Sequence, residues 1–403
     1  MSELHNKKRS GVPSTVTKWT RGAVRRLATG TLAGKVAELR AQKSGKPVRK
    51  ILIFSDRLSD TSEQQIQPLV RYRQTIAAQL GYVFEFRHTD RITDYSTESF
   101  FGYHAVGLKL IFNVPAPQAE AVAKKLFDAA RSAGARCLVF DGDDDLCVLW
   151  PGVIDACDVY IKKHRFKDLD DYSKGYVGKS NLTDYVHNTY GVDFEDDIIT
   201  ETLPLNQDQI DKISLGWNIA LDQKIYDLSR DVTLDVMGLN RKTDISCRAS
   251  YRTDIWMYGM RNSAVKILET LVDKYRIHSP TSRVSQVEYY HEVLDSRFVV
   301  SPFGCGELCW RDFEAILCGS VLIKPDMSHI ETWPNLFLAG ETYVPVAWDY
   351  SDLEDACTPL LNDETARLKM AEAARAKLLA AFTPEAFLER IDYTMKNAGV
   401  SKA

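Results

Sequence analysis

A loop with two glycines, followed by charged residues at helical spacing, is the stretch of this sequence best suited to bind an anion. Gly304 and Gly306 precede Glu307, Arg311 and Glu314. Glycines before a helix leave backbone N–H groups open to an anion such as a phosphate, and the helix dipole adds to the attraction. Arg311 and Glu314 share one helix face, and Glu307 lies one turn earlier. We therefore expect the glycine loop to bind an anion and these five residues to mark a ligand-binding crevice.

The residues around this loop predict a strand, a helix and a second strand. Residues 297–301 form a short β-branched and aromatic run, and apolar residues recur with helical period from 308 to 317. Gly319 ends the predicted helix, and the next strand begins at about residue 320. In a βαβ unit such a loop lies at the carboxyl edge of a parallel sheet, where ligands bind.

Residues 301–326, SPFGCGELCWRDFEAILCGSVLIKPD, resemble the donor-site signature of GT-B glycosyltransferases. The most similar branch is the exostosin-like and group-1-like one that builds bacterial surface polysaccharides. The letters EAILCG, which begin at Glu314, match the usual E-A-M-x-x-G core. The first glutamate of the usual pair would fall on Gly306, and Glu307 stands one residue later. Lys324 opens a KPDMSHIETWP segment that resembles the same branch, so it joins the expected donor-binding residues.

This resemblance implies an α/β fold of two Rossmann-like doubly wound domains that face a cleft. It also implies a nucleotide-sugar co-substrate whose ribose hydroxyls Glu314 orients. No other cofactor and no metal are expected, because the fold is metal-independent. The resemblance covers the signature closely and most of the chain loosely.

Four carboxylates in five residues follow a predicted strand at 136–140. A cluster that includes Asp141 and Asp143 could supply a general base or bind a divalent cation through oxygen ligands. A solvated turn that caps the next helix is the structural alternative. Since the resemblance places this segment in the acceptor-side domain of a metal-independent fold, we expect Asp141 or Asp143 to act as the base. In a retaining enzyme the carboxylate would only position the acceptor.

Cations cluster in two further loops. His164 stands in the run KKHRFK, where it could transfer a proton, neighbour a phosphate, or be a surface histidine. Arg248 and Arg252 lie in a basic loop that follows a strand predicted at 232–237. Planar guanidinium groups suit a diphosphate, so we expect these two arginines to bind the donor. An ordinary solvated basic loop is the alternative.

Length and composition predict two soluble α/β domains. The chain has 403 residues, with 45% hydrophobic and 26% charged residues, which is ordinary for globular proteins. No apolar run approaches a membrane span, and no signal-peptide core begins the chain, so a cytoplasmic location is expected. The eight cysteines form no CxxC pair, which favours reduced, buried thiols over disulfides or a zinc site.

The N-terminal segment differs in charge from the rest of the chain. Residues 1–50 carry a net charge of +11, whereas the remainder carries −15. An apolar stripe flanked by cations predicts a basic amphipathic helix at 15–43, which would suit an anionic membrane surface, with the protein at its inner face. Docking on the protein itself or on a partner, or a transit peptide, are alternatives. The acidic remainder argues against a nucleic-acid partner.

Alternating strands and helices predict parallel sheets in both halves. A single helix is expected at 207–228. The expected regions are the basic amphipathic extension (1–47), a Rossmann-like acceptor domain (48–205), a linker (206–230), a Rossmann-like nucleotide-sugar domain (231–383) and a C-terminal helix that crosses back to the first domain (384–403).

These features predict a glycosyltransferase that moves a sugar from a nucleotide-sugar to a glycan or lipid-linked glycan acceptor in surface polysaccharide synthesis. Domain closure would exclude water from the cleft. A non-catalytic glycan- or nucleotide-binding protein, or a sugar-phosphate transferase, are the alternatives. The sugar, the nucleotide, the acceptor and the anomeric outcome stay open, since they depend on side chains that only folding brings together.

Overall fold

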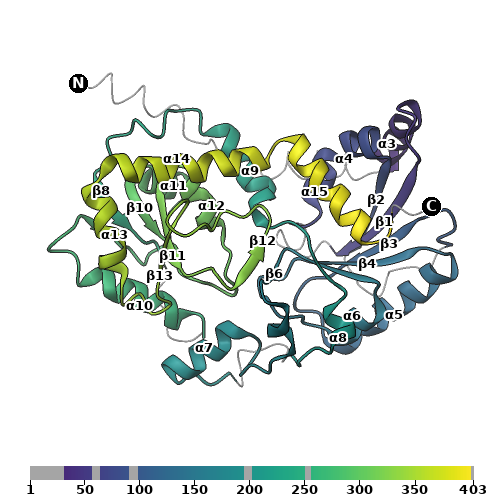
Figure 1. The fold of residues 1–403 in the computed structure, drawn as a ribbon, viewed down its shortest axis with the longest axis horizontal. Coiled ribbons are helices and arrows are strands. Elements are labelled where there is room, and N and C mark those ends of the chain that lie inside the picture. The colour runs from purple at the N-terminus through teal and green to yellow at the C-terminus, as the bar shows by residue number, and fades with distance from the viewer. Residues whose placement is uncertain (1–30, 57–63, 90–98, 195–201, 250–255, 401–403) are drawn as a thin grey trace.

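Two separate parallel sheets organise the chain in the computed structural model, which describes residues 31–56, 64–89, 99–194, 202–249 and 256–400 (Figure 1). The first sheet has six strands in the order β2-β1-β3-β4-β5-β7, and the second has five in the order β13-β11-β10-β8-β9. All neighbouring strands within each of these sheets are parallel. The predicted fold class of two Rossmann-like α/β domains is therefore confirmed.

The first sheet consists of near-continuous apolar runs, as expected for strands that helices cover on both faces. Its strands are β1 (Arg49–Asp56), β2 (Tyr82–Thr89), β3 (Ala105–Lys109), β4 (Arg136–Asp141), β5 (Val159–Lys162) and β7 (Ile213–Leu215). Its helices include α3 (Thr31–Lys43), α4 (Gln67–Leu80), α5 (Ala116–Ser132), α6 (Pro151–Ala156) and α7 (Asn181–Tyr190). The helix predicted at 67–80 is observed at these bounds as α4. Pro68 suits its first turn, and Gly81 ends it in the left-handed conformation, with φ 78°.

The second domain repeats this arrangement around a smaller sheet. Its strands are β8 (Thr243–Ser246), β9 (Ile277–His278), β10 (Ser296–Val300), β11 (Val321–Pro325) and β13 (Val344–Val346). Its helices are α10 (Tyr258–Glu269), α11 (Gln286–Leu294), α12 (Trp310–Leu317), α13 (Leu353–Asn362) and α14 (Glu364–Ala381). The strand, loop, helix and strand predicted around the two glycines are thus β10, its loop, α12 and β11.

The single helix predicted at 207–228 is wrong. This range holds α8 (Gln207–Ile210), β7, the 3-10 turn η3 (Ile219–Leu221) and the first part of α9 (Gln223–Asp231). The side chains of Asn206, Asn218 and Asp222 accept hydrogen bonds from backbone N–H groups and so start three short elements. Since β7 pairs with β5, part of the range expected to be a linker completes the first sheet.

The strand predicted at 232–237 is also wrong, and the second sheet begins with β8 instead. The apolar residues Val232 and Val236 are buried, but they belong to an irregular segment. The Asp235 side chain accepts hydrogen bonds from the N–H groups of Met237 and Gly238, which turns the backbone there.

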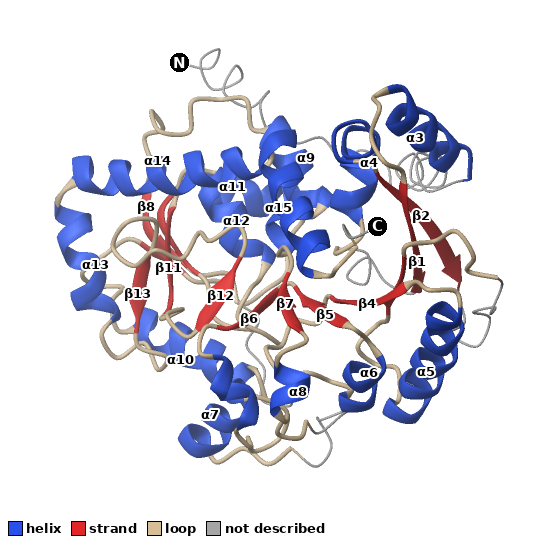
Figure 2. Cartoon of the chain, turned by 45° about the vertical axis from the view of Figure 1, so that its right-hand side comes forward, coloured by secondary structure: helices blue, strands red, loops and turns tan. Residues whose placement is uncertain are grey.

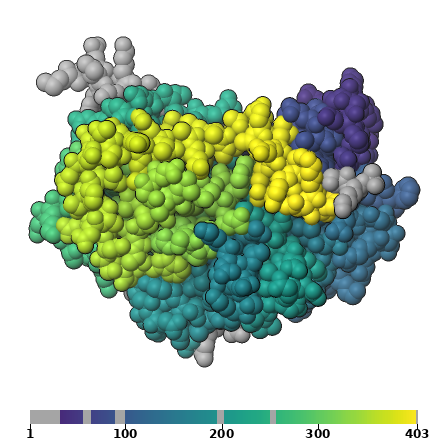
Figure 3. All heavy atoms as spheres, viewed as in Figure 1, coloured from purple at the N-terminus to yellow at the C-terminus, as the bar shows by residue number. Residues whose placement is uncertain are grey.

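The two domains contact each other through a strand pair and a helix. β6 (His164–Phe166) follows β5 in the first domain, β12 (Ile330–Thr332) belongs to the second half, and the two pair antiparallel between the sheets (Figure 2). The predicted C-terminal helix is α15 (Pro384–Asn397), and Phe387 on it packs 5.2 Å from the rings of both Tyr72 and Trp217. In the space-filling view the C-terminal helices lie over both halves (Figure 3).

All eight cysteines are unpaired and six are buried, which confirms the expected free thiols. Of the helices within the described ranges, none combines the length and apolarity needed to cross a membrane. The N-terminal half of the predicted amphipathic helix lies outside the described residues. Its remainder is α3, whose Ala37 and Ala41 pack on the body, whereas Leu32 and Leu39 are 76% and 55% exposed.

Candidate functional site

The carboxyl edges of the two sheets meet at two loops. We call residues 141–145, after β4, the acidic loop, and residues 301–309, after β10, the glycine loop. Gly306 lies so close to the acidic loop that a Cβ on it would fall 1.6 Å from the backbone oxygen of Asp144. Only glycine permits this approach, so Gly306 serves a backbone contact between the domains.

Glu307 joins the two domains from the centre of this contact. The Glu307 carboxylate is buried and accepts a hydrogen bond from Nδ2 of Asn181 at 3.1 Å. Its oxygens lie 3.5 Å from Nε2 of His164 and 3.3 Å from Nε2 of His329. Burial alone would raise the pKa of Glu307, but the two histidines outweigh it and hold the pKa below its ordinary value. Glu307 is therefore an ionised carboxylate enclosed by protein groups.

His164 is not the surface histidine that was one alternative, because its side chain is fully buried. Burial lowers the pKa of His164, although contact with Glu307 opposes this effect, so the imidazole is neutral near pH 7. Its Nδ1 has no hydrogen-bond partner within the described part of the chain. Because this side chain is fully buried, a ligand could reach the imidazole only if the acidic and glycine loops separate.

Neither of the two carboxylates expected to act as base has an unengaged side chain. Asp141 lies 2.7 Å from Nζ of the buried Lys162 and also accepts a hydrogen bond from the N–H of Asp143. Asp143 lies 3.1 Å from Nζ of Lys179. Burial raises the pKa of Asp143, but Lys179 and other lysines outweigh it and leave the pKa below its ordinary value. These pairings disfavour both aspartates as bases.

Asp145, which sequence reasoning did not single out, has the least satisfied carboxylate of the acidic loop. Its side chain is fully buried, and Oδ1 accepts a hydrogen bond from the N–H of Cys147 at 3.0 Å. Its Oδ2 has no hydrogen-bond partner among the described residues and lies 3.6 Å from Nζ of Lys179. Burial, together with Asp143 and Glu307, raises the pKa of Asp145 to about 6 against the opposing effect of Lys179.

Asp145→Asn should therefore stabilise the protein at neutral and alkaline pH. The folded state holds the Asp145 proton more tightly than the unfolded state, so this carboxyl favours folding below pH 4 and loses that effect as the pH rises through 6. Asparagine keeps an acceptor for Cys147 without the charge. We expect the free energy of unfolding in urea to rise by about 2 to 3 kcal/mol at pH 8, with the gain vanishing near pH 4. A gain that does not depend on pH would contradict the shifted pKa.

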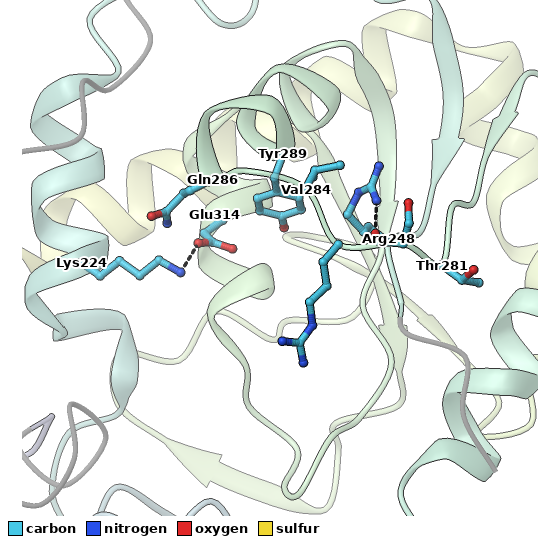
Figure 4. A pocket seen from close by; sticks show the side chains of 9 residues that line it. Lys224, Arg248, Thr281, Val284, Gln286, Tyr289 and Glu314 are labelled. Atoms are coloured by element: carbon cyan, nitrogen blue, oxygen red, sulfur yellow. Dashed lines mark hydrogen bonds and ion pairs between the residues drawn. The ribbon is translucent and has the colours of Figure 1, made fainter. Parts of the chain in front are cut away.

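A cavity of about 320 Å³ opens in the second domain beside α12 (Figure 4). This volume lies within the range of small-molecule sites. Three cations, one carboxylate, one amide and one phenol ring are among its lining groups: Lys224, Arg248, Arg283, Glu314, Gln286 and Tyr289. The sequence-predicted residues Arg248 and Glu314 are thus brought together in one cavity.

Glu314 points into this cavity from α12. Its Oε1 lies 2.7 Å from Nζ of Lys224 and accepts a hydrogen bond from the hydroxyl of Tyr290 at 3.1 Å. Figure 4 shows the Lys224 and Glu314 side chains pointing toward each other. Lys224 comes from α9, so the segment just before the second sheet closes one side of the cavity.

The two arginines of the cavity differ in their hydrogen bonds and ion pairs with the rest of the protein. Nε of Arg248 donates to Glu292 at 2.6 Å, and Arg248 also donates to the backbone oxygen of Ser282. Arg283 makes no ion pair or hydrogen bond with another described residue, so its charge is available to a ligand. Arg252, the other arginine expected to bind the donor, lies outside the described residues. The sequence around Arg283, HSPTSRVS, is a polar turn before a helix. This turn was the one feature of the sequence that could have identified Arg283 as a binding residue.

Other expected donor-binding residues hold the protein together instead of lining the cavity. Lys324 is fully buried, and its Nζ lies 3.0 Å from Oδ1 of Asp312. The prediction that Lys324 binds the donor is contradicted by this placement. Nη2 of Arg311 donates to the backbone oxygen of Arg248 at 2.9 Å, which fixes the chain beside the cavity.

The expectation that the glycine loop presents free N–H groups to a phosphate also needs correction. Oδ2 of Asp312 accepts the N–H of Cys309 at 3.0 Å, so a carboxylate of the protein caps α12. A Cβ on Gly304 would lie 2.8 Å from Nη2 of Arg261, and Gly306 faces Asp144. Cationic side chains line the cavity instead: Lys224, Arg248 and Arg283.

Two Rossmann-like domains with facing strand ends and a cationic cavity in the second define the GT-B class of architecture. Residues 265–392 match the family model described as "Glycosyl transferase-like". This range contains the glycine loop, α12 and Glu314, so this part of the chain is similar to glycosyltransferases, and the prediction of a glycosyltransferase enzyme is confirmed at that level. The narrower branch named from the sequence stays a prediction.

Comparison with solved structures gives low similarities over most of the chain. Sucrose-phosphate synthase from Thermosynechococcus elongatus is 11% identical, with a TM-score of 0.45 over 88% of this chain and 100% of that one. A glycosyltransferase from Rickettsia africae is 10% identical, with a TM-score of 0.45 over 88% of this chain and 100% of that one. An α,α-trehalose 6-phosphate synthase from Burkholderia multivorans is 10% identical, with a TM-score of 0.42 over 89% of this chain and 100% of that one. Such TM-scores assign no substrate and no residue role. No curated protein matches the chain.

Proposed function

We propose that this protein transfers a sugar from a nucleoside diphosphate sugar to a glycan acceptor. The observation that carries the proposal is the cavity in the second domain, which is lined by Arg248 and Arg283 together with the ion pair of Lys224 and Glu314. Guanidinium groups bind diphosphates in bidentate geometry. Glu314 is repelled by phosphate but accepts hydrogen bonds from sugar hydroxyls, so the two halves of a nucleotide find complementary partners here.

In this proposal the cationic side chains also lower the barrier to sugar transfer. Cleavage of the bond between the sugar and the diphosphate leaves negative charge on the diphosphate, and preorganised cations stabilise that charge. Arg283 and Arg248 supply this effect without a metal ion, in keeping with the proposed metal independence. Within the described ranges, no group of three or more metal-ligating side chains is placed to hold a metal.

The acceptor would approach from the acidic loop. Proton removal from an acceptor hydroxyl needs a base, and the candidates are Asp141, Asp143 and His164, joined by Asp145. Asp145 has the unengaged oxygen and a pKa raised to about 6, which suits a base better than the paired Asp141. Since the acidic and glycine loops are in contact, entry of an acceptor between them requires them to separate.

A panel of nucleotide-sugars tests the proposal most directly. Thermal stabilisation of the full-length protein by one nucleoside diphosphate identifies the nucleotide, because a ligand that binds only the folded state raises its stability. Turnover of the matching nucleotide-sugar must then release a nucleoside diphosphate, in the presence of EDTA as in its absence. Release of a nucleoside monophosphate would favour a sugar-phosphate transferase, and binding without turnover on any acceptor would favour a non-catalytic binding protein.

We also propose that the acceptor is a membrane-linked surface glycan and that α3 places the enzyme at the cytoplasmic face of the membrane. Leu32 and Leu39 are exposed on α3, within a segment of net charge +11. Apolar side chains flanked by cations suit the headgroup region of an anionic bilayer.

Replacing both Leu32 and Leu39 with Ser should lower binding to anionic vesicles by at least about tenfold, since each leucine contributes roughly 1.5 to 3 kcal/mol when buried. Flotation of the full chain with phosphatidylglycerol vesicles measures this effect, and neutral phosphatidylcholine vesicles show the contribution of charge. Val272→Ser, at a valine that is 57% exposed elsewhere, is the matched control. Equal flotation of the double variant and the unaltered protein would rule out α3 as the contact.

A further inference from the structure

The hydroxyl of Tyr289 is buried beside the cavity without a hydrogen-bond partner within the described part of the chain. Tyr289 lies on α11 next to Tyr290, whose hydroxyl is fully engaged. The Tyr290 hydroxyl donates to Glu314 at 3.1 Å and accepts from Nε2 of Gln286 at 2.6 Å. Of these two adjacent tyrosines on one helix, Tyr289 alone has a hydroxyl that is available to form a hydrogen bond with a ligand.

A buried hydroxyl without a partner destabilises the folded protein, because it loses its hydrogen bonds to water and forms none with the protein. Such groups are rare in folded proteins and call for an explanation, which is often a ligand. Burial raises the pKa of Tyr289 well above its ordinary value, and the nearby charge of Glu314 adds to this effect. The phenol therefore keeps its proton at neutral pH, and it is available as a hydrogen-bond donor.

The neighbours of this hydroxyl favour a sugar diol over a phosphate. The ion pair from Lys224 and the hydrogen bond from Tyr290, the two polar contacts that described residues make with the Glu314 side chain, both fall on Oε1, which leaves Oε2 for a ligand. The carboxylate would repel a phosphate at this point, whereas a ribose offers two neighbouring hydroxyls that can each donate and accept. One hydroxyl can donate to Glu314 while the other accepts from Tyr289.

We propose that Tyr289 is a ribose-binding residue, whose hydroxyl donates a hydrogen bond to a ribonucleoside diphosphate held at its other ribose hydroxyl by Glu314. This inference rests on the proposed function, since it assigns the nucleotide part of that donor to this end of the cavity. It makes the cavity selective for ribonucleotides over deoxyribonucleotides.

Tyr289→Phe in the full-length protein tests this role, with Tyr350→Phe as a matched control. The Tyr350 hydroxyl, in the second domain, is also buried and has no hydrogen-bond partner among the residues that the structure describes, but Tyr350 is not among the lining residues of the cavity. Calorimetric titration should use UDP, GDP, ADP and CDP, each also in its 2′-deoxy and 3′-deoxy form. Tyr289→Phe should weaken the preferred ribonucleotide about tenfold, the value of one hydrogen bond, and should weaken one deoxy form clearly less.

The melting temperature of the free protein separates a binding role from a structural one. Both variants remove an unsatisfied hydroxyl, so both should melt at or above the temperature of the unaltered protein. Only Tyr289→Phe should lose affinity. Unchanged affinity in Tyr289→Phe, an equal loss in Tyr350→Phe, or equal losses for the ribo and both deoxy forms would overturn the assignment while leaving the proposed function intact. If no nucleoside diphosphate binds the unaltered protein, the proposed function itself fails.

Discussion

Replacing Glu314 with Ala is expected to reduce sugar transfer by about 100-fold or more. Hydrogen bonds to a charged group contribute about 1.5 to 3 kcal/mol each, and this carboxylate would bind the ribose that fixes the donor in place. The change also leaves Lys224 without its carboxylate, 2.7 Å from Glu314 in the unaltered protein, and free to turn toward the diphosphate. Steady-state kinetics with the nucleotide-sugar found in the panel measures the loss as kcat/KM.

Two further variants separate the role of Glu314 in binding from its role in folding. Glu314→Gln keeps the shape and an acceptor oxygen, so it should retain more affinity for the nucleotide than Glu314→Ala. Glu288→Ala, on the exposed face of α11, is the control for loss of one negative charge and should leave kcat/KM unchanged. All three should show the same secondary structure by circular dichroism. Full activity in a folded Glu314→Ala protein would remove the donor site from this cavity.

Replacing Lys324 with Met is expected to cost the protein about 3 to 5 kcal/mol of stability. Lys324 and Asp312 are both fully buried with their charged atoms 3.0 Å apart, and removal of one partner leaves the other charge buried and unpaired. Methionine preserves the length of the side chain, so the loss reports the charge and not a cavity. Asp312 would keep its hydrogen bonds from Ser301 and Cys309, which places the expected loss nearer the lower value.

Urea unfolding measures this loss, and Lys369→Met on the exposed face of α14 controls for the removal of a lysine. Nucleotide affinity at a temperature where the Lys324→Met protein is folded should stay within about twofold of the unaltered value, since Lys324 does not line the cavity. A variant of normal stability with weakened nucleotide binding would restore Lys324 to the donor-binding residues.

These expectations show where local sequence patterns are informative. The bounds of α4, the glycine-ended helix α12 and its flanking strands β10 and β11 all follow from apolar periodicity and from glycine or proline at their ends. Such patterns report which face of a short segment is buried, and that property depends on neighbours in the chain. They failed at 207–237, where capping side chains divide one apolar pattern into several short elements.

The sequence by itself determined the α/β class and the unit around the glycine loop, and it predicts Glu314 as a donor-binding residue. The tertiary structure decided how the polar side chains are paired. Lys324 and Asp141 are held by buried partners, whereas Arg283, Asp145 and Tyr289 keep groups that no described residue satisfies. Pairing depends on segments far apart in the chain, as when Lys224 meets Glu314 and His164 meets Glu307. A charged residue looks the same in a sequence whether folding neutralises it or leaves it for a ligand.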